Sequence, residues 1–413
     1  MLELPSIRQA FFELLPRIRT FSPTQRKSTH SFLMNPNAID QTFAENFTLR
    51  DELGASVAVW TQSGALLSLA SGFKDKARTQ QWRASTPVLV WSATKGPAAA
   101  CALHALLESR TPLDCRVASF WPEFAQAGKA DVTVQMLLQH QAGLCTLDAA
   151  PPVEDREAVI HALESQTPAW TPGSAHGYHP RTFGFLLDEV VRRLTGGETL
   201  AHYWRRVFAD PLQLQFWMGV PEDVLPQVAP VFSSRTLPPK DDPFLSAFMS
   251  LGSLTSRSFA SPKGLHSADA MNSPAARMAS YPGFGGIGTA EALAKFYAML
   301  ACDGSLEGKK FFPAGTLSRL QNADVSGLDR VLQINTAFQC GFMLDPRTAT
   351  GVKQRQTFGP SPFAFGHPGA GGSAAFADPE RGLGFAYVMN QMSPGVLPSA
   401  RANSLVDALY SYE

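Results

Sequence analysis

Segments typical of β-strands lie near both ends of this chain, and segments typical of helices fill its middle. Residues 55–60 and 65–70 are short apolar runs separated by a Gly-containing turn, which is the pattern of a β-hairpin. Residues 373–378 and 383–389 repeat that pattern near the other end. We therefore predict an α/β (α+β) protein whose mainly antiparallel sheet is assembled from both chain ends and flanked by helices.

The predicted helices have apolar residues at helical spacing or a long Ala- and Leu-rich run. The run from Ala98 to Leu107 is expected to be a buried helix. The stretch 225–280 is rich in Pro, Ser and Met, and we expect it to be irregular. The other predicted helices lie in 36–52, 134–138, 183–194, 200–208, 290–302 and 399–412.

The order of these segments predicts two interleaved lobes and an extension. Residues 36–110 and 285–413 would form the α/β domain, and 111–284 a mainly helical lobe. Residues 1–35 would form an amphipathic N-terminal helical extension. We expect the active site to lie between the two lobes.

Charge and cysteine content exclude several classes of protein. The chain has 35 Lys and Arg and 35 Asp and Glu, so it has no net field to attract nucleic acid. No apolar run approaches the ~20 residues that span a bilayer, and the N-terminal residues lack a signal-peptide pattern. We expect a cytoplasmic protein with no membrane span. Its scattered cysteines are expected to be free thiols, at Cys101, Cys115, Cys145, Cys302 and Cys340.

Ser92 and Lys95 are the first candidates for chemistry. A serine hydroxyl is a poor nucleophile unless a base removes its proton. The spacing of three places both side chains on one face of a helix, and Ser92 would lie at the positive end of that helix. Lys95 could act as the base if burial lowers its pKa, or it could lend its charge to a second base.

A serine and a lysine at this spacing are common, and an exposed pair on a helix is the ordinary explanation. Here Lys95 is followed by Gly-Pro inside an apolar segment, which is an unusual place for a solvated charge. This setting favours a functional pair.

Four segments together resemble the superfamily of serine β-lactamases, penicillin-binding proteins and family VIII carboxylesterases. Val90–Gly96 resembles the nucleophile motif, and Val132–Leu144 is similar to the L-L-x-H-x-S-G-L segment. Trp170–Pro180 resembles the segment that carries the family's tyrosine, and Phe365–Phe376 lies where the family has its K-T-G or H-x-G strand. The resemblance implies a β-lactamase/transpeptidase-like fold, closest to class C β-lactamases and family VIII esterases.

The resemblance also implies catalytic roles. Ser92 would be the nucleophile that forms an acyl-enzyme, and Lys95 and Tyr178 would handle its proton. Whether Lys95 or Tyr178 is the working base stays open. The backbone N–H groups of Ser92 and Ala370 would form the oxyanion hole. No cofactor and no metal is expected.

Substrate-binding roles are assigned to four further residues. Gly369 would let substrate lie close to the strand, and Phe284 would line the acyl pocket. His367 could hydrogen-bond the substrate or Tyr178, or only end the strand. His140 is expected chiefly as a structural histidine in a turn that shapes the site.

The sequence departs from the β-lactamase pattern at two places. Pro180 stands where β-lactamases and peptidases have Asn or Ser, and His367-Pro368-Gly369 replaces K-T-G. A site without those groups loses its grip on anionic substrates. We therefore expect a serine carboxylesterase (EC 3.1.1 type) that cleaves small short-chain esters, with weak hydrolysis of some β-lactams. The alternatives are a β-lactamase, a D-aminopeptidase-like amidase, or an inactive binding protein on this fold. The oligomeric state cannot be read from the sequence.

Overall fold

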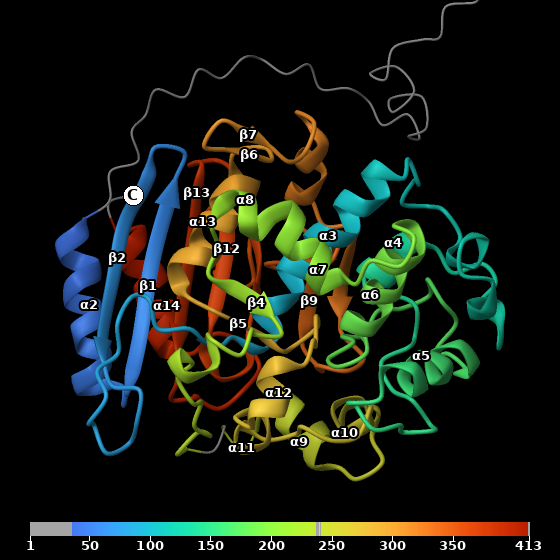
Figure 1. Ribbon diagram of the computed structural model, residues 1–413, viewed down its shortest axis with the longest axis horizontal. Helices are drawn as coiled ribbons and strands as arrows, with labels where there is room; N and C mark the ends of the chain where they lie inside the picture. The colour runs from blue at the N-terminus through green and yellow to red at the C-terminus, as the bar shows by residue number, and fades with distance from the viewer. Residues whose placement is uncertain (1–34, 237–238, 240, 412–413) are drawn as a thin grey trace, which may run out of the picture. The chain divides into compact units, whose positions relative to one another are not determined.

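A computed structural model describes residues 35–236, 239 and 241–411, and its main feature is an eight-stranded sheet (Figure 1). The strand order is β2-β1-β13-β12-β11-β10-β9-β8, and every neighbouring pair is antiparallel. The strands are β1 (Gly54–Thr61), β2 (Gly64–Gly72), β8 (Val325–Leu328), β9 (Asn335–Gln339), β10 (Phe342–Leu344), β11 (Phe365–Pro368), β12 (Ala374–Asp378) and β13 (Leu383–Met389).

The sheet joins segments from near both ends of the chain, which confirms the predicted fold class. Strand β1 pairs with β13 in a register that runs from Ala55 opposite Met389 to Thr61 opposite Leu383. Both predicted hairpins are present, as β1–β2 and β12–β13. The strands β8, β9 and β10 were not predicted, because each is short and lacks a clear apolar alternation.

Helices cover this sheet. Helix α13 (Ala290–Ala301) packs on β1, β12 and β13, and it crosses the face turned toward the viewer in Figure 1. A side chain at Gly384 of β13 would lie 2.1 Å from Ala294 O, so the missing side chain permits this close packing. Helices α2 (Pro36–Leu49) and α14 (Ala400–Leu409) pack against each other.

Residues 95–278 are largely helical, and one strand within them belongs to a second small sheet. The expectation that 225–280 is irregular was wrong, because it holds four short helices whose N-caps are Asp242, Ser253, Ser267 and Ser273. The helices are α3 (Lys95–Glu108), α4 (Val134–Leu138), α5 (Arg156–Ser165), α6 (Phe183–Leu194), α7 (Leu200–Trp204), α8 (Asp210–Leu212), α9 (Pro243–Met249), α10 (Leu254–Ala260), α11 (Ala268–Met271) and α12 (Pro274–Met278). The small sheet has the order β3-β5-β4, with β3 (Val88–Leu89), β4 (Phe216–Met218) and β5 (Gly286–Gly288), and a two-stranded ribbon joins β6 (Ser305–Leu306) to β7 (Lys309–Lys310).

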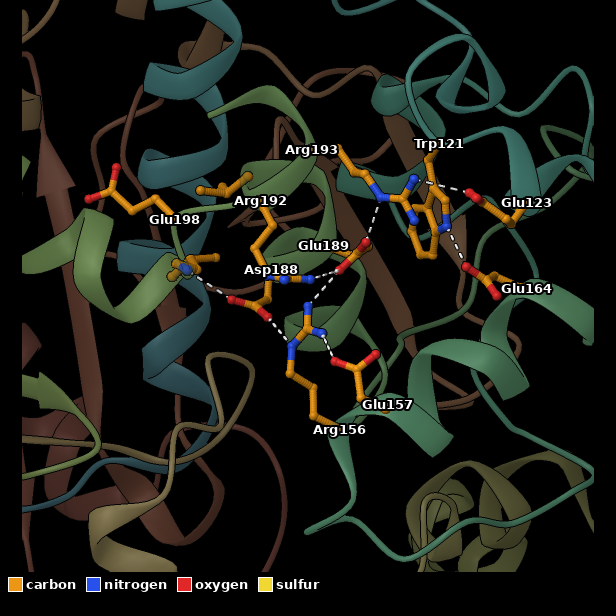
Figure 2. Close-up of polar contacts among 12 residues, drawn as sticks. Trp121, Glu123, Arg156, Glu157, Glu164, Asp188, Glu189, Arg192, Arg193 and Glu198 are labelled. Carbon is orange, nitrogen blue, oxygen red and sulfur yellow. Dashed lines mark hydrogen bonds and ion pairs between the residues drawn. The ribbon is translucent and has the colours of Figure 1, made fainter. Parts of the chain in front are cut away.

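An ionic network of buried carboxylates and partly exposed arginines joins α6 to α5 (Figure 2). Arg156 of α5 donates to Asp188 at 2.8 Å and to Glu189 at 2.5 Å. Glu189 also accepts from Arg192 and Arg193 of its own helix, at 3.0 and 2.7 Å. Burial favours the neutral form of Glu189, but the three arginines outweigh it and lower the pKa of this carboxyl. Glu189 therefore stays ionised, and its ion pair with Arg156 fixes α6 to α5.

The described part of the chain holds the five cysteines as free thiols, as predicted. None of its helices combines the length and the apolar character needed to cross a bilayer. The predicted extension 1–35 lies almost wholly outside the described residues.

Candidate active site

The predicted nucleophile lies at a sharp change of direction in the chain. Strand β3 is followed by a 3₁₀ turn, η1 (Trp91–Thr94), which leads directly into α3. Trp91 has φ +50°, a left-handed backbone conformation that residues other than glycine rarely adopt. Ser92 follows it and is half-buried. The strained turn thus separates the strand from the helix and presents Ser92 between them.

Lys95 is the first residue of α3, and its side chain is fully buried. Its Nζ lies 3.3 Å from Ser92 Oγ. It also donates to two backbone carbonyl oxygens, 2.9 Å to Pro180 O and 2.7 Å to Gly283 O. These two carbonyls come from segments far from α3 in the sequence, so the lysine sits where three parts of the chain meet.

The environment of Lys95 disfavours its charge. Burial lowers the pKa of this amine well below its ordinary value, and the nearby positive charge of Arg181 lowers it further. No carboxylate is bonded to Lys95 among the described residues. Both effects favour the neutral form of the amine.

Tyr178 lies beside both residues. Lys95 Nζ is 4.7 Å from the centre of the Tyr178 ring. Burial raises the pKa of the Tyr178 phenol above its ordinary value, and a hydrogen bond with the Ser92 side chain offsets only part of that rise. The hydroxyl, amine and phenol that the sequence singled out are thus brought together, with the phenol in its protonated form.

The two predicted oxyanion donors lie on adjacent segments. A Cβ at Gly369 would lie 2.1 Å from Val90 O, which shows how closely the end of β11 packs on the segment before Ser92. Ala370 follows at the start of the turn η7 (Ala370–Gly372). The predicted donors, the N–H groups of Ser92 and Ala370, therefore lie on two closely packed segments, and their role as an oxyanion hole stays a prediction.

His367 of β11 is buried and lies beside Tyr178, with ring centres 5.8 Å apart. Its Nδ1 is 2.7 Å from Pro368 O, so Nδ1 carries the proton and Nε2 is an acceptor. Burial, followed by the charge of Lys95, lowers the pKa of His367 to about 3. The position that the resembling families give to a cation therefore holds a neutral ring here.

His140 is buried behind the phenol, and its ring centre is 5.0 Å from that of Tyr178. Its Nδ1 accepts from the backbone N–H of His179 at 3.2 Å. His179 Nε2 accepts from Leu144 N–H at 3.0 Å. These contacts make both histidines part of the turn that supports Tyr178, and their rings are not arranged as a metal-binding pair.

Phe284 is buried next to the Gly283 carbonyl that accepts from Lys95. Its ring stacks on Tyr281 with centres 5.2 Å apart, and the guanidinium of Arg181 lies 4.9 Å from it. Arg181 donates to three backbone carbonyls, those of Pro262, Gly264 and Leu265.

Several residues of this site were missed by sequence reasoning. Arg181 directly follows the tyrosine motif, but nothing in the sequence shows that its charge reaches Lys95. Asp329 holds the Tyr178 backbone from 151 positions away. The carbonyls of Pro180 and Gly283 carry no side-chain signal at all. Each depends on tertiary contacts that spacing alone cannot reveal.

Taken together, this arrangement places the Ser92 hydroxyl beside a buried amine whose pKa is lowered and a protonated phenol, with the N–H groups of Ser92 and Ala370 on adjacent segments. Those are the groups that acyl transfer through a covalent serine intermediate requires. In the described residues, no group of three or more His, Cys, Asp or Glu side chains is placed to hold a metal ion.

Known proteins are similar to this chain in sequence and in fold. The model of the Beta-lactamase family matches residues 39–409. "Esterase/beta-lactamase LipL" of Mycobacterium tuberculosis (strain ATCC 25618 / H37Rv) is 30% identical over 369 residues, which cover 86% of this chain and 82% of that protein. A penicillin-binding protein homologue from Caulobacter crescentus is 32% identical, with a TM-score of 0.81 over 93% of this chain and 99% of that one. A family VIII carboxylesterase is also 32% identical, with a TM-score of 0.80 over 92% and 98% of the two chains.

Proposed function

Since the chain belongs to the Beta-lactamase family of serine hydrolases, we propose that it is a carboxylesterase that cleaves short-chain esters through an acyl-enzyme on Ser92. The proposal rests on one observation above all. Lys95, fully buried, has its Nζ 3.3 Å from Ser92 Oγ and within hydrogen-bonding distance of two carbonyl oxygens.

That geometry suits a neutral amine that acts as the general base. A neutral amine has two N–H donors and one lone pair. In the neutral form, with its two N–H groups on the carbonyls of Pro180 and Gly283, the amine would turn its lone pair to the third neighbour, Ser92, and could accept the hydroxyl proton. The lowered pKa of Lys95 supports this assignment, and the raised pKa of Tyr178 argues against a phenolate base.

Acylation then follows in a balanced sequence. Ser92 Oγ attacks the ester carbonyl carbon while its proton passes to Lys95 Nζ, and the oxyanion is bound by the N–H groups of Ser92 and Ala370. The C–O bond to the alcohol breaks, and the departing oxygen takes the proton of the Tyr178 phenol. Lys95 returns its proton to Tyr178, so both groups end as they began.

Deacylation uses the same groups with water in place of Ser92. Water gives a proton to the base as its oxygen attacks the acyl carbon. The bond to Ser92 Oγ breaks, and Ser92 Oγ takes up the proton that the base received from water. The products are a carboxylic acid and a regenerated enzyme.

A neutral substrate is proposed because of the charges near Ser92. His367 is neutral, since its pKa lies at about 3, and Lys95 is directed toward Ser92 and two carbonyls. A β-lactam or peptide carboxylate would find no fixed cation at the His367 position. The names of two relatives, a family VIII carboxylesterase and an esterase/beta-lactamase, are consistent with ester hydrolysis. The second of these names also makes β-lactam hydrolysis the alternative to test.

The test measures release of p-nitrophenol from its acetate and butyrate esters. Ser92→Ala should lower kcat/KM by ~1000-fold or more and abolish covalent labelling by a fluorophosphonate. Ser68→Ala changes an exposed serine on β2 and is the matched control, which should retain full activity. Faster turnover of the cephalosporin nitrocefin than of any ester would overturn the substrate proposal. Full activity or labelling in Ser92→Ala would overturn the mechanism.

A further inference from the structure

Asp329 is a fully buried carboxylate whose two oxygens accept five hydrogen bonds from four donors. Its Oδ1 accepts from the backbone N–H groups of Val331 and Leu332, both at 2.8 Å. Its Oδ2 accepts from the Thr336 hydroxyl at 3.1 Å. The Tyr178 N–H is shared by both oxygens, at 3.0 and 3.1 Å. Such a dense set of donors fixes the carboxylate and everything bonded to it.

Two further bonds tie the same part of the chain to the segment of Tyr178. His176 Nε2 lies 2.9 Å from Thr336 Oγ1, and because Thr336 donates to Asp329, the histidine must donate to Thr336. The Arg330 N–H donates to His176 O at 3.1 Å. Residues 176–178 are thus joined to residues 329–336 at three points.

The ring of Tyr178 is held from the same side. Phe338 of β9 stacks on it, with ring centres 6.4 Å apart and planes 12° from parallel. Phe338 belongs to β9, and Asp329 is hydrogen-bonded to Thr336 of the same strand. One short stretch of chain therefore places the backbone and the ring of Tyr178 together.

The charge of Asp329 also acts on the phenol. Tyr178 faces Lys95, His140, His367 and Asp329, and the two histidines are buried rings whose pKa values are lowered. Burial raises the pKa of Tyr178, the hydrogen bond with Ser92 lowers it in part, and the negative charge of Asp329 raises it further. A negative charge at this position favours the protonated phenol, so the proton stays on Tyr178 until the leaving alcohol takes it.

We propose that Asp329 is the positioning residue of Tyr178: it clamps the tyrosine backbone so that the phenol stays beside Ser92 and Lys95 as the acid for the leaving alcohol. This inference rests on the proposed function, because it assumes that Tyr178 protonates that alcohol. Asp329 itself touches neither Ser92 nor Lys95.

The choice of leaving group provides a test that a purely structural role would not affect. p-Nitrophenolate departs without a proton at neutral pH, whereas ethoxide must be protonated as the C–O bond breaks. A displaced phenol should therefore impair ethyl butyrate far more than p-nitrophenyl butyrate. The quantity to measure is kcat/KM for both esters, since it reports the acylation step.

Asp329→Asn keeps the size of the side chain and replaces one acceptor oxygen with an N–H donor, and Asp329→Ala removes both acceptors. We expect kcat/KM for ethyl butyrate to fall at least ~10-fold more than for p-nitrophenyl butyrate in the Asn variant. The Ala variant should show a larger difference, and Tyr178→Phe should show the same preference for the aryl ester. If the Ala variant does not fold, the Asn variant alone decides.

Asp345→Asn is the matched control. Asp345 is also buried and accepts from two backbone N–H groups, those of Thr357 and Phe358, but its partners lie outside the site. It should change thermal stability without changing the ratio of the two esters.

Equal losses for both esters in Asp329→Asn, or the same change of ratio in Asp345→Asn, would overturn the inference and leave the proposed function intact. A wild-type protein that cleaves neither ester would overturn both.

Discussion

At the scale of single residues, the burial of Lys95 is the main chemical feature of the site. Its side chain has lost water on all sides and has gained two carbonyl partners and the Ser92 hydroxyl in exchange. Burial lowers the pKa of this lysine well below its ordinary value, so keeping it in the folded chain costs stability wherever the unfolded chain holds the proton.

This cost predicts a pH dependence of stability. Between the lowered pKa of Lys95 and the ordinary lysine pKa of ~10.4, the unfolded chain binds one proton more than the folded chain. The free energy of unfolding of the wild type should therefore rise relative to Lys95→Met by about 1.4 kcal/mol per pH unit in that window. Urea denaturation of both proteins at several pH values measures the slope.

The same experiment on Lys310→Met provides the control, because Lys310 is exposed on β7. The free energy of unfolding of that variant should differ from that of the wild type by the same amount at every pH. A flat difference between wild type and Lys95→Met would mean that Lys95 is charged in the folded protein, and the general base would have to be sought elsewhere.

The sequence predicted the residues that have a reactive side chain and a recognisable spacing. Ser92, Lys95 and Tyr178 were named and lie together in the structure. Their roles remain predictions. Asp329 gave no signal, because an isolated aspartate in an apolar segment looks the same whether or not it meets Tyr178.

At the scale of elements, the start of α6 determines where the Gly283 carbonyl lies. Gly184 is the second residue of this helix, and a Cβ there would lie 2.1 Å from Gly283 N and 2.7 Å from Gly283 Cα. The absence of a side chain lets the two backbones touch. Gly283 O is thereby kept 2.7 Å from Lys95 Nζ.

Gly184→Ala should therefore damage activity even though alanine favours helices by about 1 kcal/mol over glycine. The added methyl group would push the Gly283 segment away from α6 and remove an acceptor from Lys95. We expect kcat/KM for p-nitrophenyl butyrate to fall ~10-fold or more, with a lower melting temperature.

Gly128→Ala serves as the comparison, because its methyl group would meet nothing within 4 Å and its only penalty comes from the backbone, at φ +81°. It should leave kcat/KM unchanged. Wild-type activity in Gly184→Ala would show that the Gly283 carbonyl does not need this close contact.

Elements with a strong local pattern were predicted, and elements that depend on their neighbours were not. Helix α13 and the β1–β2 hairpin have long runs of suitable residues. Strands such as β10 span only three residues and exist because adjacent strands supply their hydrogen bonds. The helices α9 to α12 are short, and their signal lay in N-cap residues rather than in apolar periodicity.

At the scale of the whole described chain, a buried ion pair links the start of β1 to the closing helix. Arg401 of α14 donates to Glu52 at 2.7 Å, and both side chains are almost fully buried. The Tyr387 hydroxyl of β13 donates to the same carboxyl. Burial raises the pKa of Glu52 to about 7, although the charge of Arg401 lowers it.

Arg401→Met should destabilise the protein by about 3–5 kcal/mol at about pH 8.5, because the buried Glu52 loses its only charged hydrogen-bond donor among the described residues. The loss should be smaller at about pH 6, where Glu52 can take up a proton, since its pKa without Arg401 would lie above about 7. Chemical denaturation at both pH values measures this difference.

The double variant Glu52→Gln/Arg401→Met is the control, since it removes both charges. It should recover part of the lost stability and lose most of the dependence on pH. A loss in Arg401→Met that is equal at both pH values would show that Glu52 does not titrate in this range.

The pairing of β1 with β13 also has a consequence for biosynthesis. A ribosome releases β1 early, but the strand that completes its hydrogen bonds leaves the exit tunnel only after most of the polypeptide has been made. The nascent β1–β2 hairpin must therefore wait with one edge unpaired, and chains interrupted before β13 would expose that edge to other copies. Translation that stalls late in the message should be more harmful to solubility than its small loss of length suggests.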